Sequence, residues 1–162
     1  MHRMSASACV DAPAAVVWEH LARLDQIHLW TDLIHDARIE GACHRGVGAE
    51  RVCELGPGRS NRERVIAWDE GRSYTYVSFD APMMKEARNT WSVTPMGDRA
   101  LVRTDAEIVF RGGWFGQALG FVLVPLLGWL MPNPLVKFKF WVENGRPYEG
   151  KARTLPVPLT GC

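Results

Sequence analysis

The stretch LVRTDAEIVF occupies residues 101–110 and alternates between two kinds of side chain. Positions 102, 104, 106, 108 and 110 carry Val, Thr, Ala, Ile and Phe, whereas positions 103, 105 and 107 carry Arg, Asp and Glu. Because successive side chains of a β-strand point to opposite faces of the sheet, this pattern predicts a strand with one covered face and one wet face. We therefore expect Thr104, Ile108 and Phe110 to point into the protein.

Further strand-length runs precede this stretch, and turn signals rich in Gly, Pro and Asp separate them. Residues 3–10 are also compatible with a strand, so the sequence predicts seven antiparallel strands. Two short helices are expected after the first strand, at Ala14–Leu24 and from Asp25 to about Trp30. The runs between these helices and residue 101 are Ile34–Glu40, Gly48–Leu55, Ser60–Trp68, Ser73–Phe79 and Glu86–Thr94.

After the strand at residues 101–110, residues 112–136 read GGWFGQALGFVLVPLLGWLMPNPLV and carry no charge. A run of this length suggests a transmembrane helix, but its many Gly and Pro residues are poorly suited to crossing hydrocarbon. An amphipathic pattern then resumes over residues 137–143, as in a helix docked on a sheet. We therefore predict an apolar lid, and because residues 114–131 have only Gln117 as a polar side chain, we expect them to contact a second copy or a membrane surface.

Length and net charge limit the number of domains and the kinds of partner that the chain can have. A chain of 162 residues with net charge +1 fits one domain, over residues 1–145, and does not favour nucleic acid as a partner. Residues 146–162 read as a Pro/Gly-rich tail. The N-terminal residues lack the apolar core of a secretory signal, and the four cysteines show no paired spacing. We expect reduced thiols in a cytoplasmic protein that can associate with a membrane.

A single C-terminal helix cannot completely fill the concave face of a bent sheet with side chains, so a cavity is expected between the two. The order of several motifs then resembles the SRPBCC (START/Bet v 1-like) superfamily, and within it the polyketide cyclase/dehydrase branch. The resemblance covers about residues 4–145 and implies an α+β helix-grip fold that holds a hydrophobic ligand between the sheet and a long C-terminal helix. The motifs are VDAPAAVVWEHLARLDQIHLW (10–30), GVGAERV (46–52), RERVIAWDEGRSYTYVSF (62–79), WSVTPMGD (91–98) and KFKFWVENG (137–145).

Strand parity and the resemblance together select candidate ligand-binding residues. Parity predicts that Asn89 and Trp91, on the strand that precedes residues 101–110, point inward. A family-like alignment turns Arg62 and Arg64 inward. The alternative is that both arginines pair with acids on neighbouring strands, such as Glu50 and Glu54. In the strand SYTYVSF (73–79) parity is ambiguous, because either Tyr74 and Tyr76 or Val77 and Phe79 could be buried, and we favour Tyr76. The full set is Trp30, Ile34, Arg62, Arg64, Tyr76, Asn89, Trp91, Thr104, Ile108, Phe110 and Phe121.

Two functions fit these residues. The first is binding, without turnover, of a lipid, a polyketide-like compound or an aromatic compound. The second is a polyketide cyclase, aromatase or dehydratase, in which Arg64 stabilises an enolate while Asn89 and Tyr76 hold carbonyl oxygens. We expect no metal, because the histidines lack ligand spacings, and no cofactor, because the nucleotide-binding and esterase motifs are missing. We rank binding above catalysis.

Overall fold

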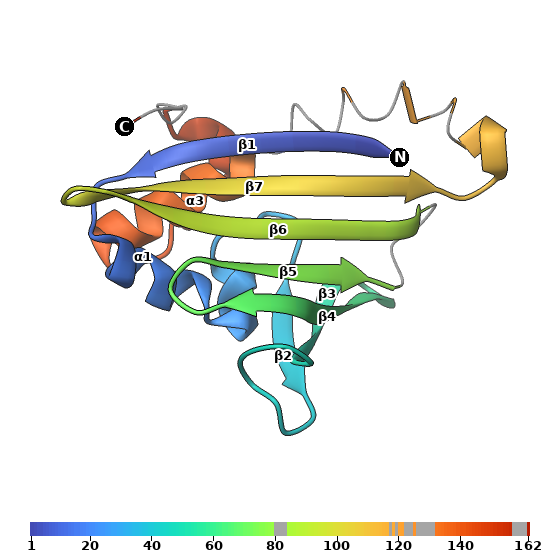
Figure 1. Cartoon of the computed structure of the whole chain (residues 1–162), viewed down its shortest axis with the longest axis horizontal. Coiled ribbons are helices and arrows are strands. Elements are labelled where there is room, and N and C mark those ends of the chain that lie inside the picture. Colours follow the sequence, from blue (N-terminus) through green and yellow to red (C-terminus); the bar gives the residue numbers. More distant parts are fainter. Residues whose placement is uncertain (80–83, 117, 119, 122–124, 126–131, 157–161) are drawn as a thin grey trace.

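The computed structural model describes residues 1–79, 84–116, 118, 120–121, 125, 132–156 and 162. Within these residues, seven strands form an antiparallel sheet in the order β1-β7-β6-β5-β4-β3-β2 (Figure 1). The strands are β1 (His2–Val10), β2 (Asp36–Glu40), β3 (Glu50–Gly56), β4 (Arg59–Asp69), β5 (Ser73–Ser78), β6 (Met84–Met96) and β7 (Arg99–Phe110). The helices are α1 (Ala14–Leu21) and α3 (Pro132–Asn144), and the 3-10 helices are η1 (Leu24–Leu29) and η2 (Ala152–Thr154).

This architecture confirms the prediction of a curved seven-stranded antiparallel sheet with a C-terminal helix. The turn signals placed the strands well because each marks a reversal of the chain. Gly97, for example, has a φ of 71° in the tight turn between β6 and β7, a conformation that favours glycine. The helix α3 includes the amphipathic pattern at residues 137–143. Most of the predicted lid, 117, 119, 122–124 and 126–131, lies outside the described residues.

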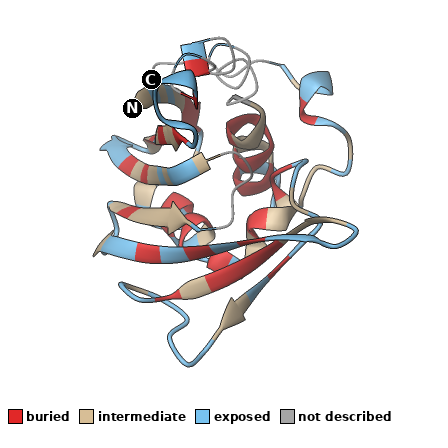
Figure 2. Ribbon diagram, turned by 90° about the vertical axis from the view of Figure 1, so that its right-hand side faces the viewer, coloured by how far each residue is buried: buried red, intermediate tan, exposed pale blue. Residues whose placement is uncertain are grey.

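The core forms where η1, the sheet and α3 meet. The indole of Trp30, which follows η1, lies 5.1 Å from the ring of Trp91 on β6 and 5.3 Å from that of Phe138 on α3, edge to face in both cases. All three side chains are buried. Figure 2 shows how buried residues gather in the helices and in the strands that face them. Large aromatic surfaces packed in this way contribute strongly to stability, and they fix α3 against the concave face of the sheet.

The C-terminal tail is tied to the body of the domain at two points. Asp32 accepts hydrogen bonds from Lys137 Nζ at 2.9 Å and from the backbone N–H of Ala152 at 3.0 Å, and these contacts lower the pKa of its carboxyl despite partial burial. A disulfide joins Cys9 on β1 to Cys162. The expectation that all four thiols are reduced is therefore wrong, because the fold brings together two cysteines that lie 153 residues apart in the sequence.

Among the described residues, no helix is both long and apolar enough to cross a bilayer.

Removal of the disulfide should destabilise the protein, because the cross-link restricts the unfolded chain. We predict that Cys162→Ser lowers the melting temperature by about 4–16 °C, the range expected when about 2–4 kcal/mol is lost from a chain of this size. Circular dichroism melts of the oxidised protein measure this shift. Cys43→Ser is the control, since Cys43 is an exposed free thiol. Equal melting temperatures for wild type and Cys162→Ser would show that the cross-link does not stabilise the fold.

Candidate functional site

A band of polar side chains crosses the concave face of the sheet, from β7 to β3. It is unusual because it lies among buried apolar and aromatic residues, where an unpaired polar group is costly. We call it the polar strip and define it as Thr104, Asn89, Tyr76, Arg51, Glu63 and Asn61.

One end of the polar strip is a chain of neutral hydrogen bonds. The Thr104 hydroxyl on β7 donates to Asn89 Oδ1 on β6 at 2.8 Å, and Asn89 Nδ2 donates to the Tyr76 hydroxyl on β5 at 3.2 Å. Tyr76 and Asn89 are direct register partners in the β5–β6 ladder. The Tyr76 oxygen is thus the acceptor in this pair, which leaves its O–H directed elsewhere.

The other end is a buried ion pair between register partners on β3 and β4. Arg51 Nε donates to Glu63 Oε2 at 2.6 Å, and its Nη1 donates to the carbonyl oxygen of Leu24 on η1 at 3.0 Å. Asn61 Nδ2 donates to the second oxygen of Glu63 at 2.9 Å. Burial alone would lower the pKa of the guanidinium, but the Glu63 carboxylate outweighs burial and raises it, so Arg51 remains charged.

The two ends meet at Tyr76, whose ring lies 4.8 Å from the Arg51 guanidinium carbon. Burial, reinforced by the Glu63 charge, raises the pKa of Tyr76, and burial raises the pKa of the neighbouring Tyr74 to about 12. Burial and Glu63 also raise the pKa of the Cys53 thiol to about 12. At neutral pH both phenols are therefore neutral donors, and Cys53 is not a thiolate nucleophile.

Three further polar groups near the polar strip have no hydrogen-bond partner in the described part of the chain. They are the hydroxyl of Tyr74 and the indole N–H groups of Trp30 and Trp91, and all three side chains are almost completely buried. Tyr74 and Trp91 are register partners on β5 and β6, and the Trp91 ring contacts Trp30. A buried donor without an acceptor costs about 1–3 kcal/mol, so this interior has unused capacity to bind oxygen atoms.

A small hollow lies between the polar strip and η1. It holds about 170 Å³ of space not filled by atoms and is too narrow for a water molecule. Its walls combine the charged pair and Tyr76 with apolar side chains. The lining residues are Leu24, Ala49, Arg51, Glu63, Val65 and Tyr76.

The family model for "Polyketide cyclase / dehydrase and lipid transport" matches residues 1–139. The chain belongs to this family. The resemblance to the SRPBCC superfamily and its cyclase/dehydrase branch is thereby confirmed. No similar sequence is found among curated proteins.

Solved structures related to this cyclase/dehydrase-family chain share its fold. A protein from Thermobifida fusca is 26% identical, with a TM-score of 0.68 over 88% of this chain and 96% of that one. A protein from Thermus thermophilus is 16% identical, with a TM-score of 0.71 over 89% and 99%. The Zhui aromatase/cyclase from Streptomyces sp. R1128 is 18% identical, with a TM-score of 0.59 over 69% and 70%.

Most residues selected from the sequence lie on the inner side of this cyclase/dehydrase-family fold. Asn89 and Tyr76 are half-buried and in contact with each other, whereas Ile34 packs at the edge of the core. Their role in binding a ligand stays a prediction. The fully buried members are Trp30, Trp91, Thr104, Ile108 and Phe110.

The predicted inward orientation of Arg62 and Arg64 is wrong. Both side chains are 52% exposed on the outer face of the sheet, where Arg62 pairs with Glu40 at 3.4 Å and Arg64 pairs with Glu50. The alternative of cross-strand pairing holds for Arg64 and Glu50, whereas Glu54 instead pairs with Arg38. The physical reason is that Glu63, between the two arginines, points inward to neutralise Arg51.

Phe121, which was also selected as a ligand-binding residue, does not face the interior. Its side chain is 74% exposed and lies edge-on against the His2 ring at 5.1 Å. The backbone at Gly120 approaches so closely that an added Cβ would lie 2.3 Å from His2 Nε2 and 2.8 Å from a Phe110 ring carbon. The next side chain is therefore turned away from the interior.

The sequence analysis missed Arg51, Glu63 and Asn61, which form half of the polar strip. The available signal was the run NRER at residues 61–64, where both faces of one strand carry polar groups. A strand that is polar on both faces and lies in the middle of a sheet must bury some of those groups. The family-like alignment turned Arg62 and Arg64 inward, but which side chains of β4 are buried depends on the partner on β3, Arg51.

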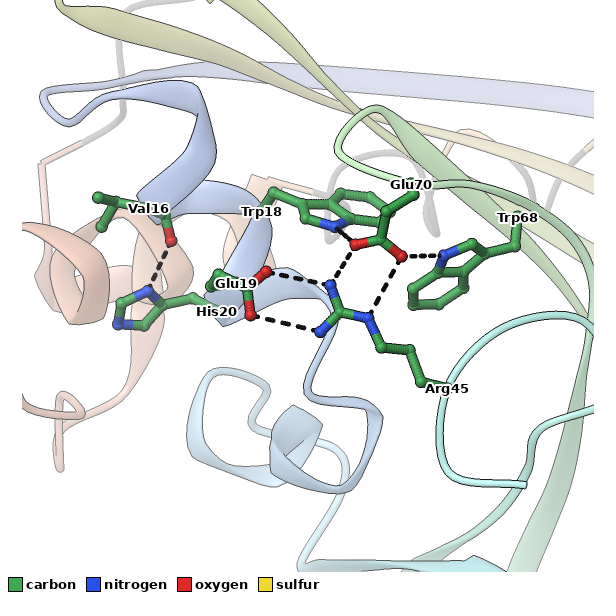
Figure 3. A network of polar contacts seen from close by, with 7 residues as sticks. All are labelled: Val16, Trp18, Glu19, His20, Arg45, Trp68 and Glu70. Atoms are coloured by element: carbon green, nitrogen blue, oxygen red, sulfur yellow. Dashed lines mark hydrogen bonds and ion pairs between the residues drawn. The ribbon is translucent and has the colours of Figure 1, made fainter. Parts of the chain in front are cut away.

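A second polar cluster closes the α1 end of the concave face (Figure 3). The Glu70 carboxylate, in the turn after β4, accepts hydrogen bonds from the indole N–H groups of Trp18 and Trp68, each at 2.7 Å. Arg45, in the loop after β2, pairs with both Glu70 and Glu19 of α1. These donors, Arg45 foremost, lower the pKa of Glu70 to about 2. The cluster joins α1, the β2–β3 loop and the β4–β5 turn.

Protonation of Glu70 should weaken this cluster. Because its pKa is about 2 in the folded protein and ordinarily 4.5, its contribution is complete above about pH 4.5 and is lost as the pH falls through 2. We predict that Glu70→Gln lowers the melting temperature at pH 7 by about 2–4 °C. The difference from wild type should shrink as the pH falls from 4.5 towards 2.

Urea unfolding of both proteins between pH 7 and pH 3 measures this pH dependence. Glu86→Gln is the matched control, since it removes only an exposed pair with Arg88 and should change stability little at any pH. A stability difference between wild type and Glu70→Gln that stays constant down to pH 3 would contradict the proposed role of the Glu70 charge.

Proposed function

We propose that the protein binds a hydrophobic small molecule that carries at least one oxygen acceptor, on the concave face between the sheet and α3. Membership in a family of polyketide cyclases, dehydrases and lipid transport proteins supports a role in binding or cyclising a hydrophobic molecule. The observation that carries the proposal is the polar strip, set among aromatic walls and accompanied by buried donors that lack acceptors.

The chemistry of these donors selects the class of ligand. Phenol O–H and indole N–H groups are neutral at neutral pH, so they suit the carbonyl or hydroxyl oxygens of an uncharged ligand. An anionic ligand would need a cation of its own, and the cation of the strip, Arg51, is already neutralised by Glu63. The aromatic rings of Trp30, Trp91 and Phe138 offer flat apolar surface for a lipid, polyketide-like or aromatic body.

Binding would also require the interior to open. Small-molecule sites usually hold about 300–1,000 Å³, whereas the hollow beside the polar strip is too narrow to admit a water molecule. The ligand would enlarge this hollow by separating η1 from the strip. Leu24 contributes to that wall through its side chain and through its carbonyl contact with Arg51.

A cyclase or dehydratase acting in the same cavity is the second candidate, and the contact between Tyr76 and Asn89 favours it. An O–H and an amide held 3.2 Å apart could bind a substrate carbonyl while another carbon of the chain attacks it. The set Arg64, Asn89 and Tyr76 is not available for this purpose, because Arg64 lies on the outer face. Because the described residues bring no unpaired cation to the polar strip to stabilise an enolate, we place binding first.

Loss of the Tyr76 hydroxyl should weaken ligand binding without unfolding the protein. We predict that Tyr76→Phe reduces the affinity for a hydroxyanthraquinone, a ring system with carbonyl oxygens, by about 3–15-fold, the effect of one hydrogen bond. Asn89→Leu should have a similar effect, because Asn89 orients that hydroxyl. Quenching of tryptophan fluorescence measures the affinity.

Arg64→Gln is the control on the outer face and should bind the probe as wild type does. Native mass spectrometry of the purified protein provides an independent measurement, and a co-purifying hydrophobic compound that is lost on denaturation would support the proposal. If wild type neither binds the probe nor carries a compound, the protein is not a carrier of this class. If Tyr76→Phe and Arg64→Gln behave alike, the polar strip does not orient the ligand.

A further inference from the structure

Three aromatic side chains are exposed in the segment that follows β7. Trp114, Phe115 and Phe121, which we call the aromatic tip, are 73%, 66% and 74% exposed. Trp114 and Phe115 stack with ring centroids 3.7 Å apart. In Figure 1 the short helical turn that directly follows β7 projects past the carboxyl end of that strand, at the opposite end of the sheet from α1 and α3. Single exposed apolar residues are ordinary, but three large aromatics within eight positions mark a surface that meets something other than water.

Local contacts hold the aromatic tip outward rather than allow it to fold back. Arg111 Nε donates to the backbone oxygen of Met84 at 2.9 Å, which ties the start of the turn to β6. The N–H of Gly116 bonds to the oxygen of Gly112 at 3.3 Å and closes one helical turn. At its far end, Gly120 is packed against His2 and Phe110, and Phe121 rests on His2. The three rings are therefore presented on a fixed base.

Within the part of the chain that the structure describes, the charges nearest the aromatic tip that have no ion-pair partner are basic. The sequence has no Asp or Glu from residue 108 to residue 142, and Arg111 immediately precedes the tip. Lys85 is exposed at the adjacent start of β6. The nearest acids on the neighbouring strands, Glu86 and Glu107, are paired with Arg88 and Arg3. An apolar centre with a basic margin is complementary to a bilayer that has anionic headgroups.

The three described rings of the aromatic tip form a surface that is small for contact with a second copy of the chain. An aromatic side chain buries about 150–250 Å² at most, so the exposed parts of three rings could bury on the order of 400–500 Å². A stable dimer needs about 800 Å² from each partner. A bilayer has no such requirement, because Trp and Phe side chains partition individually into its interfacial region.

We propose that the aromatic tip docks the protein on anionic membranes by inserting Trp114, Phe115 and Phe121 among the lipid headgroups. This role is independent of the ligand proposed for the concave face. It would place the β7 end of the sheet at the surface of the bilayer, with Arg111 and Lys85 at the level of the phosphates.

Co-sedimentation with vesicles tests this proposal. We expect wild type to pellet with phosphatidylcholine vesicles that contain about 30% phosphatidylserine, and less with pure phosphatidylcholine. The double variant Trp114→Ser/Phe115→Ser should lose at least about tenfold in partition coefficient, because it removes most of the inserted surface. Leu33→Ser/Val47→Ser is the matched control, as it removes two residues that are 70% and 63% exposed elsewhere, and it should pellet as wild type does.

Quenching of tryptophan fluorescence by brominated lipids gives a second readout, which should disappear in Trp114→Ser/Phe115→Ser. Sedimentation velocity of the same proteins without lipid completes the test. The proposal is overturned if wild type stays in the supernatant with both kinds of vesicle, or if the two double variants pellet equally. It is also overturned if wild type is a dimer that Trp114→Ser/Phe115→Ser converts to a monomer without any change in vesicle binding.

Discussion

The interior of this protein is organised around one costly interaction, the buried ion pair between Arg51 and Glu63. Removing two charges from water costs several kcal/mol per ion, and partners for the remaining polar atoms offset part of this cost, although Arg51 Nη2 has no hydrogen bond within the described residues. Those partners come from three other places in the fold: the Leu24 carbonyl on η1, the Asn61 amide on β4 and the ring of Tyr76 on β5. The pair therefore fixes the register of β3 against β4, the inward face of β4 and the approach of η1 to the sheet.

The polar strip extends this constraint across the sheet. Tyr76 contacts Arg51 through its ring and Asn89 through its hydroxyl, so the ion pair is mechanically coupled to the neutral hydrogen bonds that reach Thr104. Because replacing a buried ion pair by packed apolar side chains is often neutral or stabilising, stability alone does not explain why such a pair is present. The ligand site that we propose would give the pair a role. The Glu70 cluster and the cross-linked C-terminal tail keep the surrounding elements in place.

Much of this fold could be predicted from the sequence, because turn residues mark each strand and the alternation over residues 101–110 is clear on both faces. The same reasoning selected Tyr76, Asn89 and Thr104, which the structure brings into one hydrogen-bonded chain. It could not orient β4, where Asn61, Arg62, Glu63 and Arg64 are all polar and the pattern gives no inward side. That choice depends on Arg51 in another strand. The disulfide was equally inaccessible, since it depends on where the tail meets β1 and not on cysteine spacing. The cytoplasmic location expected from that spacing stays a prediction. The disulfide does not favour it, because disulfides are typical of oxidising compartments.

The central claim is that the Arg51–Glu63 pair serves the ligand site more than the stability of the fold. The most direct test is titration of the double variant Arg51→Met/Glu63→Leu with the hydroxyanthraquinone probe, together with its free energy of unfolding. The account predicts a folded protein whose stability is unchanged or higher by about 1–4 kcal/mol, with probe affinity reduced at least about tenfold. A double variant that binds the probe as tightly as wild type would contradict it.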